Sequence, residues 1–215
     1  MKIGVFDSGV GGLSVANAIK KALPDYEVVL KEDKEHVPYG TKTPEVLLEL
    51  VTPILQSLVN EGCNVIVVAC NTVTTTLIKD LRAIIKVPLV AIEPMVKPAA
   101  ELTKSNIIAV CATPTTLASA RYAWLKQVYA KNVQVLEPDC SDWVFMIEHN
   151  EIDQEKIDTR IREVLDKGAD VIVLGCTHFH WIEEEINKLS AGRAKVIQPE
   201  EAIINRLKAV IEQLP

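Results

Sequence analysis

The sequence predicts an α/β fold made of two lobes related by a pseudo-two-fold axis, each a mostly parallel sheet flanked by helices. The first observation is that short β-rich runs alternate with helical patterns along all 215 residues, as is typical of βαβ units. The second is that the order of elements in the first half recurs in the second half. With 48% hydrophobic residues, the chain can bury the cores that two such lobes require.

Eight runs have the length and composition of strands. They are residues 2–7, 26–31, 64–69, 88–92, 106–111, 132–136, 170–175 and 194–198. Between the second and third runs, apolar residues recur in pairs every four positions from Val46 to Val59, which predicts an amphipathic helix. Thr43 and Pro44 have the residue types of an N-cap and a first-turn proline, so the helix is expected to begin there.

An internal repeat relates the two halves of the chain. The run VIVVACNT begins at Val65, and its counterpart VIVLGCTH begins at Val171, 106 residues later. On this alignment Cys70 falls on Cys176. The repeat therefore predicts that the two cysteines occupy the same position in two copies of one lobe.

The repeat also predicts the domain boundaries. Residues 1–93 are expected to form the first lobe and residues 94–199 the second, with a last helix in 200–215 returning to the first lobe. Ligands of open parallel sheets bind beyond the carboxyl ends of the strands, and both cysteines directly follow such an end. Two lobes facing each other would place Cys70 and Cys176 on opposite walls of one cleft.

Charge and cysteine usage exclude several classes of protein. The net charge of −6, without a basic block, argues against a nucleic-acid surface. No apolar run approaches the roughly 20 residues of a membrane span. Five cysteines without a CxxC pair indicate reduced thiols rather than disulfides, so a cytoplasmic location is expected.

Each of the two aligned cysteines lies between a strand and a helix, where unpaired helix N–H groups favour a thiolate. The alternative is that each is a small buried hydrophobic residue. Two cysteines at equivalent repeat positions favour a functional pair of thiols, each able to act as a base or a nucleophile. Cys63 and Cys111 lie in apolar strand context and are assigned to the core, while Cys140 has no evident partner.

Asp7 ends the first predicted strand and opens the glycine-rich segment DSGVGGLS. Such a loop offers backbone amides to an anion. A dinucleotide-binding loop would need a third glycine where Ser14 stands, and Asp7 would repel a pyrophosphate. A small carboxylate bound by the amides, with Asp7 acting as a carboxylate, is the favoured interpretation.

His178 follows Cys176 by two residues and titrates near neutrality, so it can tune that thiol or relay its proton. Together with His180 these residues also suggest zinc, but no further ligand cluster completes a site, and no metal is expected. N-capping is the structural interpretation of three polar residues near the cysteines, Asn71, Thr72 and Thr177.

Five segments of the chain resemble the glutamate racemases of the cofactor-independent aspartate/glutamate racemase superfamily. They are DSGVGGLS from Asp7, VPYGTKT from Val37, VACNT around Cys70, ATPTTLASARY from Ala112 and LGCTH around Cys176. The resemblance implies a two-domain homodimer with its site between the lobes. It also implies interconversion of L- and D-glutamate without a cofactor, supplying D-glutamate for peptidoglycan.

The resemblance assigns roles to individual residues. Cys70, assisted by Asp7, corresponds to the base that takes the proton from D-glutamate. Cys176, assisted by His178, corresponds to the base for L-glutamate, and Glu148 is similar to a family carboxylate beside it. The remaining matches are expected to contact the substrate: Ser8, Pro38, Tyr39 and Gly40 at its side-chain carboxylate, and Asn71, Thr72, Thr113, Thr116 and Thr177 at its amino-acid end. Asp33 falls where the family has an acidic residue before the proline.

Two other interpretations of the sequence remain open. One is a relative with another specificity, such as an aspartate racemase or a one-cysteine decarboxylase. Thr74 and His178 argue against the aspartate racemase, and the presence of a second cysteine argues against the decarboxylase. The other is a non-catalytic binding protein, which would be expected to lack one or more of the four proposed acid–base residues. The chain looks shorter than the family, and Phe179, His180 and Trp181 replace a common Tyr-Pro pair.

Overall fold

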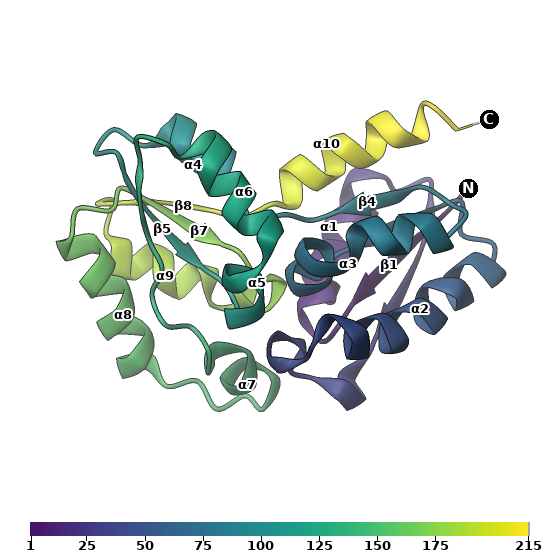
Figure 1. The fold of residues 1–215 in the computed structure, drawn as a ribbon, viewed down its shortest axis with the longest axis horizontal. Coiled ribbons are helices and arrows are strands. Elements are labelled where there is room, and N and C mark those ends of the chain that lie inside the picture. Colours follow the sequence, from purple (N-terminus) through teal and green to yellow (C-terminus); the bar gives the residue numbers. More distant parts are fainter. Residues whose placement is uncertain (215) are drawn as a thin grey trace. The chain divides into compact units, whose positions relative to one another are not determined.

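The computed structural model describes residues 1–214, which form two compact units. The first unit consists of Met1–Glu93 together with the C-terminal helix α10 (Glu200–Ile211), and the second of Pro94–Gln198. Each unit contains one four-stranded sheet in which every pairing is parallel. Figure 1 shows both sheets with helices packed around them, as the α/β prediction requires.

In the first unit the strand order is β2-β1-β3-β4. The strands are β1 (Lys2–Asp7), β2 (Glu27–Glu32), β3 (Val65–Val68) and β4 (Leu89–Ala91). The helices are α1 (Gly11–Ala22), α2 (Pro44–Asn60), α3 (Asn71–Ile84) and α10, with the short 3₁₀ turns η1 (Lys34–His36) and η2 (Tyr39–Thr41) between β2 and α2.

The central strand β3 is apolar and buried along its whole length, as expected for a strand of a parallel sheet covered on both faces. Ile66 and Val68 of β3 pack with α2 and α3 on one face. Val65 and Val67 of the same strand pack on the other face with residues of α1 and α10. Alternate side chains of one short strand thus hold together helices that are far apart in the sequence.

Helix α2 begins where the sequence predicts. Thr43 is the N-cap, and its hydroxyl accepts a hydrogen bond from the Val46 N–H at 3.5 Å. Pro44 occupies the first helical position, where the missing N–H costs nothing. Four residues of the predicted apolar stripe, Leu47, Val51, Leu55 and Leu58, are completely buried.

The second unit has the equivalent order β6-β5-β7-β8. Its strands are β5 (Ile107–Cys111), β6 (Gln134–Leu136), β7 (Val171–Leu174) and β8 (Lys195–Ile197). Its helices are α4 (Val96–Leu102), α5 (Pro114–Ala118), α6 (Ala120–Tyr129), α7 (Trp143–Glu148), α8 (Gln154–Asp166), the 3₁₀ helix η3 (Thr177–Ile182) and α9 (Glu183–Ser190). All eight predicted strands are present, with bounds within two residues of the prediction.

The two sheets have matching registers. In the first, Ile3 pairs with Val65; in the second, Ile108 pairs with Val171. The third strands are therefore related by the predicted 106 residues, whereas the first strands, Ile3 to Ile108, are related by 105. The offset of 106 residues at β3 and β7 therefore does not hold along the whole chain, because the connecting segments of the two units differ in length.

One polar pair shows that the repeat extends to single interactions. Asn64 precedes β3, and its side-chain oxygen accepts a hydrogen bond from the Lys2 N–H at 2.9 Å. Asp170 precedes β7 and accepts from the N–H groups of Lys104 and Ser105 at 2.7 and 2.8 Å. In both units, the residue before the third strand thus holds the backbone at the start of the first strand, β1 or β5.

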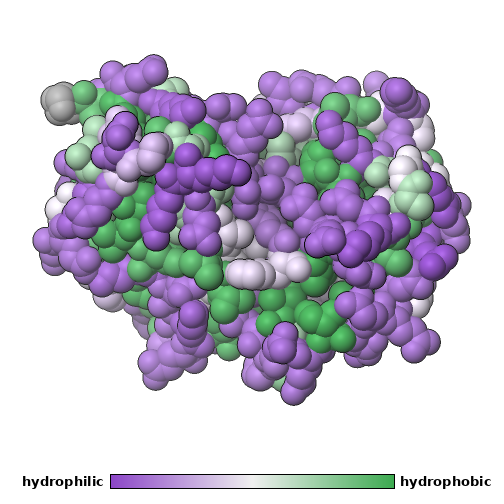
Figure 2. Space-filling view, turned by 180° about the vertical axis from the view of Figure 1, so that it is seen from behind, coloured by the Kyte–Doolittle hydropathy of each residue, from purple (hydrophilic) through white to green (hydrophobic). Residues whose placement is uncertain are grey.

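None of the helices in the described part of the chain is long and apolar enough to cross a membrane. Figure 2 shows hydrophilic side chains spread over the visible face, with apolar residues in small groups among them. The larger apolar side chains on the surface include Trp181, which is 53% exposed, and Phe145, which is 50% exposed.

Candidate active site

Cys70 lies where β3 passes into α3. Its backbone is extended, and its carbonyl accepts the first helical hydrogen bond, from the Thr74 N–H at 3.0 Å, so Cys70 is the N-cap of α3. The thiol is therefore next to the unpaired N–H groups of the first helical turn, which favour a negative charge. The side chain is only 5% exposed.

The end of β1 places Asp7 and Ser8 beside this thiol. The β1–β3 ladder continues past the strand, since the Ala69 N–H donates to the Phe6 carbonyl at 2.7 Å. Asp7 is fully buried, and its Oδ1 accepts from the Ser8 N–H at 2.8 Å. The Ser8 Oγ lies 3.5 Å from the Cys70 Sγ. A thiol, a hydroxyl and a carboxylate thus meet at the carboxyl edge of one sheet, here called the Cys70 site.

Tyr39 adds an aromatic wall to the Cys70 site. Its ring packs near Phe6, with 6.5 Å between the ring centroids, and its hydroxyl donates to the Asp33 Oδ2 at 2.5 Å. Burial, this hydrogen bond and the negative charges of Asp33, Cys70 and Asp7 all raise the pKa of Tyr39 far above its usual range. The hydroxyl therefore stays protonated and acts as a hydrogen-bond donor.

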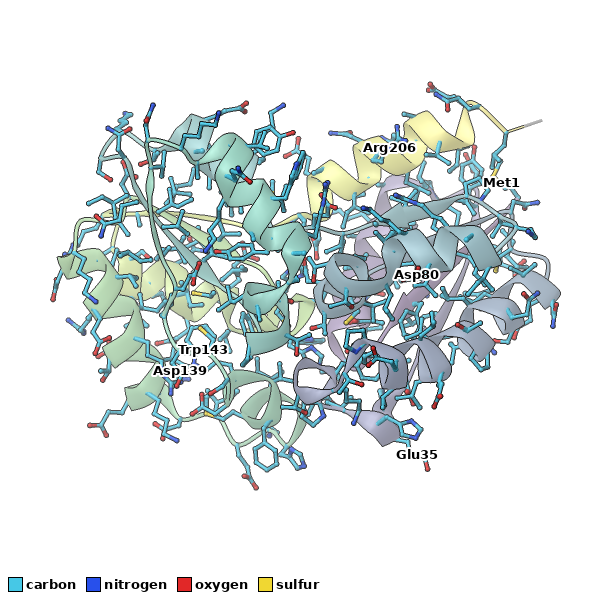
Figure 3. The ribbon with its side chains drawn as sticks, viewed as in Figure 1. Met1, Glu35, Asp80, Asp139, Trp143 and Arg206 are labelled. Atoms are coloured by element: carbon cyan, nitrogen blue, oxygen red, sulfur yellow. The ribbon has the colours of Figure 1, made fainter. Side chains whose placement is uncertain are left out.

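Asp33 is held in turn by His36, whose Nδ1 lies 2.7 Å from the Asp33 Oδ1. The network from His36 through Asp33 to Tyr39 is formed by the segment that contains η1 and η2. Figure 3 shows that Glu35, between these residues, points outward instead. The sequence located Asp33 only through the resemblance and did not connect it with His36 or with the tyrosine hydroxyl.

Asn71 is the first residue of α3 and is 2% exposed. Neither its side-chain nitrogen nor its oxygen has a hydrogen-bond partner among the described residues. A buried amide without partners is costly unless another molecule satisfies it. This is the feature expected of a residue that binds a polar substrate.

Cys176 occupies the equivalent position in the second unit. It follows Gly175 at the end of β7 and is the N-cap of η3, with its carbonyl accepting from the Phe179 N–H at 3.0 Å. Its side chain is 7% exposed. The prediction that Asn71, Thr72 and Thr177 are N-caps is wrong, because the turn into each helix comes earlier and the cysteine itself is the cap.

A histidine and a carboxylate extend from this second thiol. The Cys176 Sγ lies 3.8 Å from the His178 Nδ1, and the His178 Nε2 lies 2.5 Å from the Glu148 Oε1. His178 is 2% exposed and the Glu148 side chain 12%. An ionised carboxylate only accepts hydrogen bonds, so it favours the proton on Nε2 and turns Nδ1 toward the thiol. These three residues form the Cys176 site.

Helix α7 delivers Glu148 to this site. The Trp143 ring packs edge-on against Phe179 of η3, with 4.9 Å between the ring centroids, and both side chains are fully buried. Figure 3 shows Trp143, the first residue of α7, inside the second unit. The sequence singled out Glu148 only through the resemblance, and the packing of α7 on η3 brings its carboxylate to His178.

The other predicted contact residues are divided between the two units. In the first, Gly40 and Thr72 are buried and Pro38 is half-buried. In the second, Thr113 caps α5, and its hydroxyl donates to the Thr116 Oγ1 at 3.0 Å. Thr113 follows β5 at the same sheet edge as Cys176, since the Gly175 N–H donates to the Cys111 carbonyl at 2.7 Å.

The remaining cysteines differ from these two. Burial raises the pKa of the Cys63 thiol. Burial and a hydrogen bond with Cys111 raise the pKa of the Cys140 thiol well above its ordinary value. Cys140 therefore does have a partner, which the sequence could not reveal because the loop before α7 must fold back onto the end of β5.

The fold and these residues define an α/β protein with two buried thiols, one in each unit, at equivalent strand ends. Comparisons with known proteins agree. The sequence profile of the Asp/Glu/Hydantoin racemase family matches residues 3–207. The glutamate racemase of Stutzerimonas stutzeri is 37% identical over 98% of this chain and 82% of its own length.

Solved structures give the same result. The chain superposes on Escherichia coli glutamate racemase in complex with L-glutamate and the activator UDP-MurNAc-Ala, with a TM-score of 0.92 and 30% identity, over 99% of this chain and 83% of the other. For Francisella tularensis glutamate racemase in complex with D-glutamate the TM-score is 0.83 with 27% identity, over 99% and 81% of the two chains. The chain belongs to the Asp/Glu/Hydantoin racemase family.

Proposed function

We propose that this protein is a glutamate racemase that interconverts L- and D-glutamate by a two-base proton transfer between Cys70 and Cys176. The observation that carries the proposal is that equivalent ends of two matching sheets hold the thiols, and that each thiol has its own acid–base neighbour. The names of the relatives at about 37% identity and of the structural neighbours support glutamate as the substrate.

Inversion at carbon requires a base on one face of the α-carbon and an acid on the other. In the proposed reaction the Cys70 thiolate, assisted by Asp7, takes the α-proton of D-glutamate. The Cys176 thiol, assisted by His178 and Glu148, then gives a proton to the opposite face and yields L-glutamate. The reverse reaction exchanges these roles, so one sulfur is a thiolate whenever the other carries a proton.

Binding must orient the substrate and stabilise the charge that develops when the α-proton leaves. We assign the side-chain carboxylate of glutamate to Ser8, Pro38, Tyr39 and Gly40. The amino-acid end is assigned to Asn71, Thr72, Thr113, Thr116 and Thr177. The two unpartnered amide atoms of Asn71 are the strongest support for this assignment within the first unit.

The first test is incubation of the purified protein with L- or D-glutamate in deuterium oxide, without added cofactor. We expect racemisation together with incorporation of deuterium at the α-carbon. Turnover of aspartate but not glutamate would instead identify an aspartate racemase, the other specificity that the family allows. Deuteration without inversion by the wild-type protein would contradict a two-base racemase.

Single-cysteine variants allow each half of the reaction to be followed separately. In Cys176→Ala, Cys70 is expected to exchange the α-proton of D-glutamate for deuterium without inversion. In Cys70→Ala, Cys176 is expected to do the same with L-glutamate. This exchange assay is needed because racemisation has an equilibrium constant of one, so a defect at either thiol lowers kcat/KM equally in both directions.

We further propose that the two units are the domains of a cytoplasmic homodimer that supplies D-glutamate for peptidoglycan. A cytoplasmic location suits a reaction that needs two reduced thiols. Exposed aromatic residues such as Trp124, which is 41% exposed, offer apolar surface for an interface. Light scattering should give twice the 23.7 kDa mass of the chain, and a mass of one chain would contradict the dimer.

A further inference from the structure

We infer that Gly12 is a positioning residue for catalysis, because only a residue without a side chain lets the Asp7 carboxylate lie against the start of α1 beside the Cys70 site. The inference rests on the proposed function in one respect, namely that Asp7 assists Cys70. It adds a residue to which the sequence pattern and the family match gave no role.

The steric evidence concerns one short contact. A Cβ added to Gly12 would lie 2.5 Å from the Asp7 Cβ, closer than two carbon atoms can approach. It would also lie 3.2 Å from the Leu30 Cδ1 and 3.4 Å from the Asp7 Oδ2. Gly12 is not among the glycines with a positive φ, so the requirement is for space and not for an unusual backbone conformation.

Asp7 cannot easily move away from such a Cβ. It pairs with Glu32 in the β1–β2 ladder, and its carbonyl accepts a hydrogen bond from the Asp33 N–H at 3.3 Å. The conflicting atom of Asp7 is its Cβ, which is fixed by the backbone of the strand. A side chain at position 12 must therefore displace the start of α1 from the end of β1, or shift the backbone that carries the Asp7 carboxylate.

Either displacement would reach the thiol. The Asp7 carboxylate accepts from the Ser8 N–H, and the Ser8 hydroxyl lies 3.5 Å from the Cys70 sulfur. The carboxylate also lies across the first turn of α1, whose N–H groups stabilise an anion. Gly12 thus permits an arrangement in which a fully buried Asp7 stays next to the thiol it assists.

The second unit places its carboxylate differently from the first. By the matching registers of β1 and β5, the position equivalent to Asp7 is Ala112. That unit brings its carboxylate to the site from α7 instead, through Glu148 and His178. A carboxylate at the strand end is therefore not required by the fold, and in the first unit Gly12 leaves the space in which Asp7 places one.

The test uses Gly12→Ala, with Gly4→Ala as the matched control. A Cβ at Gly4 would also be crowded, by Ile66, Leu58 and Cys63 at 3.1 to 3.3 Å, but these are core side chains away from Asp7. Alanine is normally preferred to glycine in a helix, so a fall in Tm for Gly12→Ala is diagnostic. We expect Gly12→Ala to lower kcat about 100-fold, as for a displaced catalytic group, while Gly4→Ala keeps kcat within threefold.

A double-mutant cycle of Tm values tests this inference independently of the proposed function. Asp7→Gly removes the atom with which the new Cβ collides, so Gly12→Ala should lower the Tm in the wild-type background but not in the Asp7→Gly background. Equal losses of Tm in both backgrounds, or wild-type kcat in Gly12→Ala, would overturn the inference. Because unfolding is measured without glutamate, the double-mutant cycle tests the contact between positions 7 and 12 even if the substrate is not glutamate.

Discussion

The chain of contacts from Glu148 through His178 to Cys176 gives the most specific prediction. Glu148→Gln keeps the shape of the side chain but removes its charge at a 2.5 Å contact with the His178 Nε2. A hydrogen bond to a charged group contributes about 1.5–3 kcal/mol. Since each 1.4 kcal/mol is a factor of ten, kcat/KM should fall about 10- to 100-fold in both directions of racemisation.

The location of the defect is checked by the exchange assay. Added to Cys70→Ala, the Glu148→Gln change should slow α-deuteration of L-glutamate by the same factor. Added to Cys176→Ala, it should leave α-deuteration of D-glutamate unchanged, because Glu148 acts through His178 on the other thiol. Glu151→Gln, at an exposed position three residues further on, is the matched control and should have no effect in either background.

Two results would refute this reasoning. The first is wild-type exchange of L-glutamate in the Glu148→Gln variant, which would mean that the carboxylate does not support His178. The second is an equal loss in both single-cysteine backgrounds, which would mean that the substitution disturbs the fold or the binding of substrate in general. Circular dichroism and the Tm of each variant distinguish these two explanations.

Three further predictions concern the surroundings of the thiols and the repeat. Asp33→Asn weakens the acceptor of the Tyr39 hydroxyl and should raise the KM for glutamate about tenfold with a smaller change in kcat; an unchanged KM would exclude Tyr39 from binding. Trp143→Ala should cost about 3–5 kcal/mol in urea unfolding and slow exchange at Cys176 more than at Cys70, since Trp143 supports α7; equal slowing would contradict that role. Asp170→Ala should cost about 2 kcal/mol at pH 7, against about 1 kcal/mol for the equivalent Asn64→Ala. Partial burial alone would raise the pKa of Asp170, but its hydrogen bonds with Thr103, Lys104 and Ser105 lower it. The stability that wild type gains over Asp170→Ala should therefore be complete above about pH 4 and shrink as the pH falls further. A stability difference that does not depend on pH would argue against an ionised Asp170.

Much of the fold could be predicted because it is written in local patterns. The strands are short apolar runs, and Thr43 with Pro44 marks the start of α2 through its own residue types. The repeat between Val65 and Val171 revealed that Cys70 and Cys176 are equivalent, and the registers of the two sheets agree with it. These features depend on neighbours in the sequence or on direct self-similarity.

What could not be predicted depends on tertiary packing. Glu148 reaches His178 only because Trp143 and Phe179 hold α7 on η3, and no periodicity announces that contact. The bond from Tyr39 to Asp33 joins residues on either side of an irregular turn. Gly12 lies within the DSGVGG segment, yet its role is visible only as a distance to Asp7.

The asymmetry of the two sites has a simple structural origin. Position for position, the end of β1 carries Asp7 where the end of β5 carries Ala112. The histidine beside the second thiol, His178, likewise stands where the first unit has Thr72, two residues after its cysteine. The two units thus carry equivalent thiols with different neighbouring polar groups, as expected if each thiol acts on a different enantiomer.

Each cysteine is proposed to act on one enantiomer of glutamate, and isotope exchange in the single-cysteine variants tests this assignment. Wild type, Cys70→Ala and Cys176→Ala are each incubated with L- and D-glutamate in deuterium oxide, and both inversion and α-deuteration are followed. We predict that wild type inverts and labels both enantiomers, that Cys176→Ala labels only D-glutamate, and that Cys70→Ala labels only L-glutamate, neither with inversion. A single-cysteine variant that still racemises at close to the wild-type rate would contradict the two-base account.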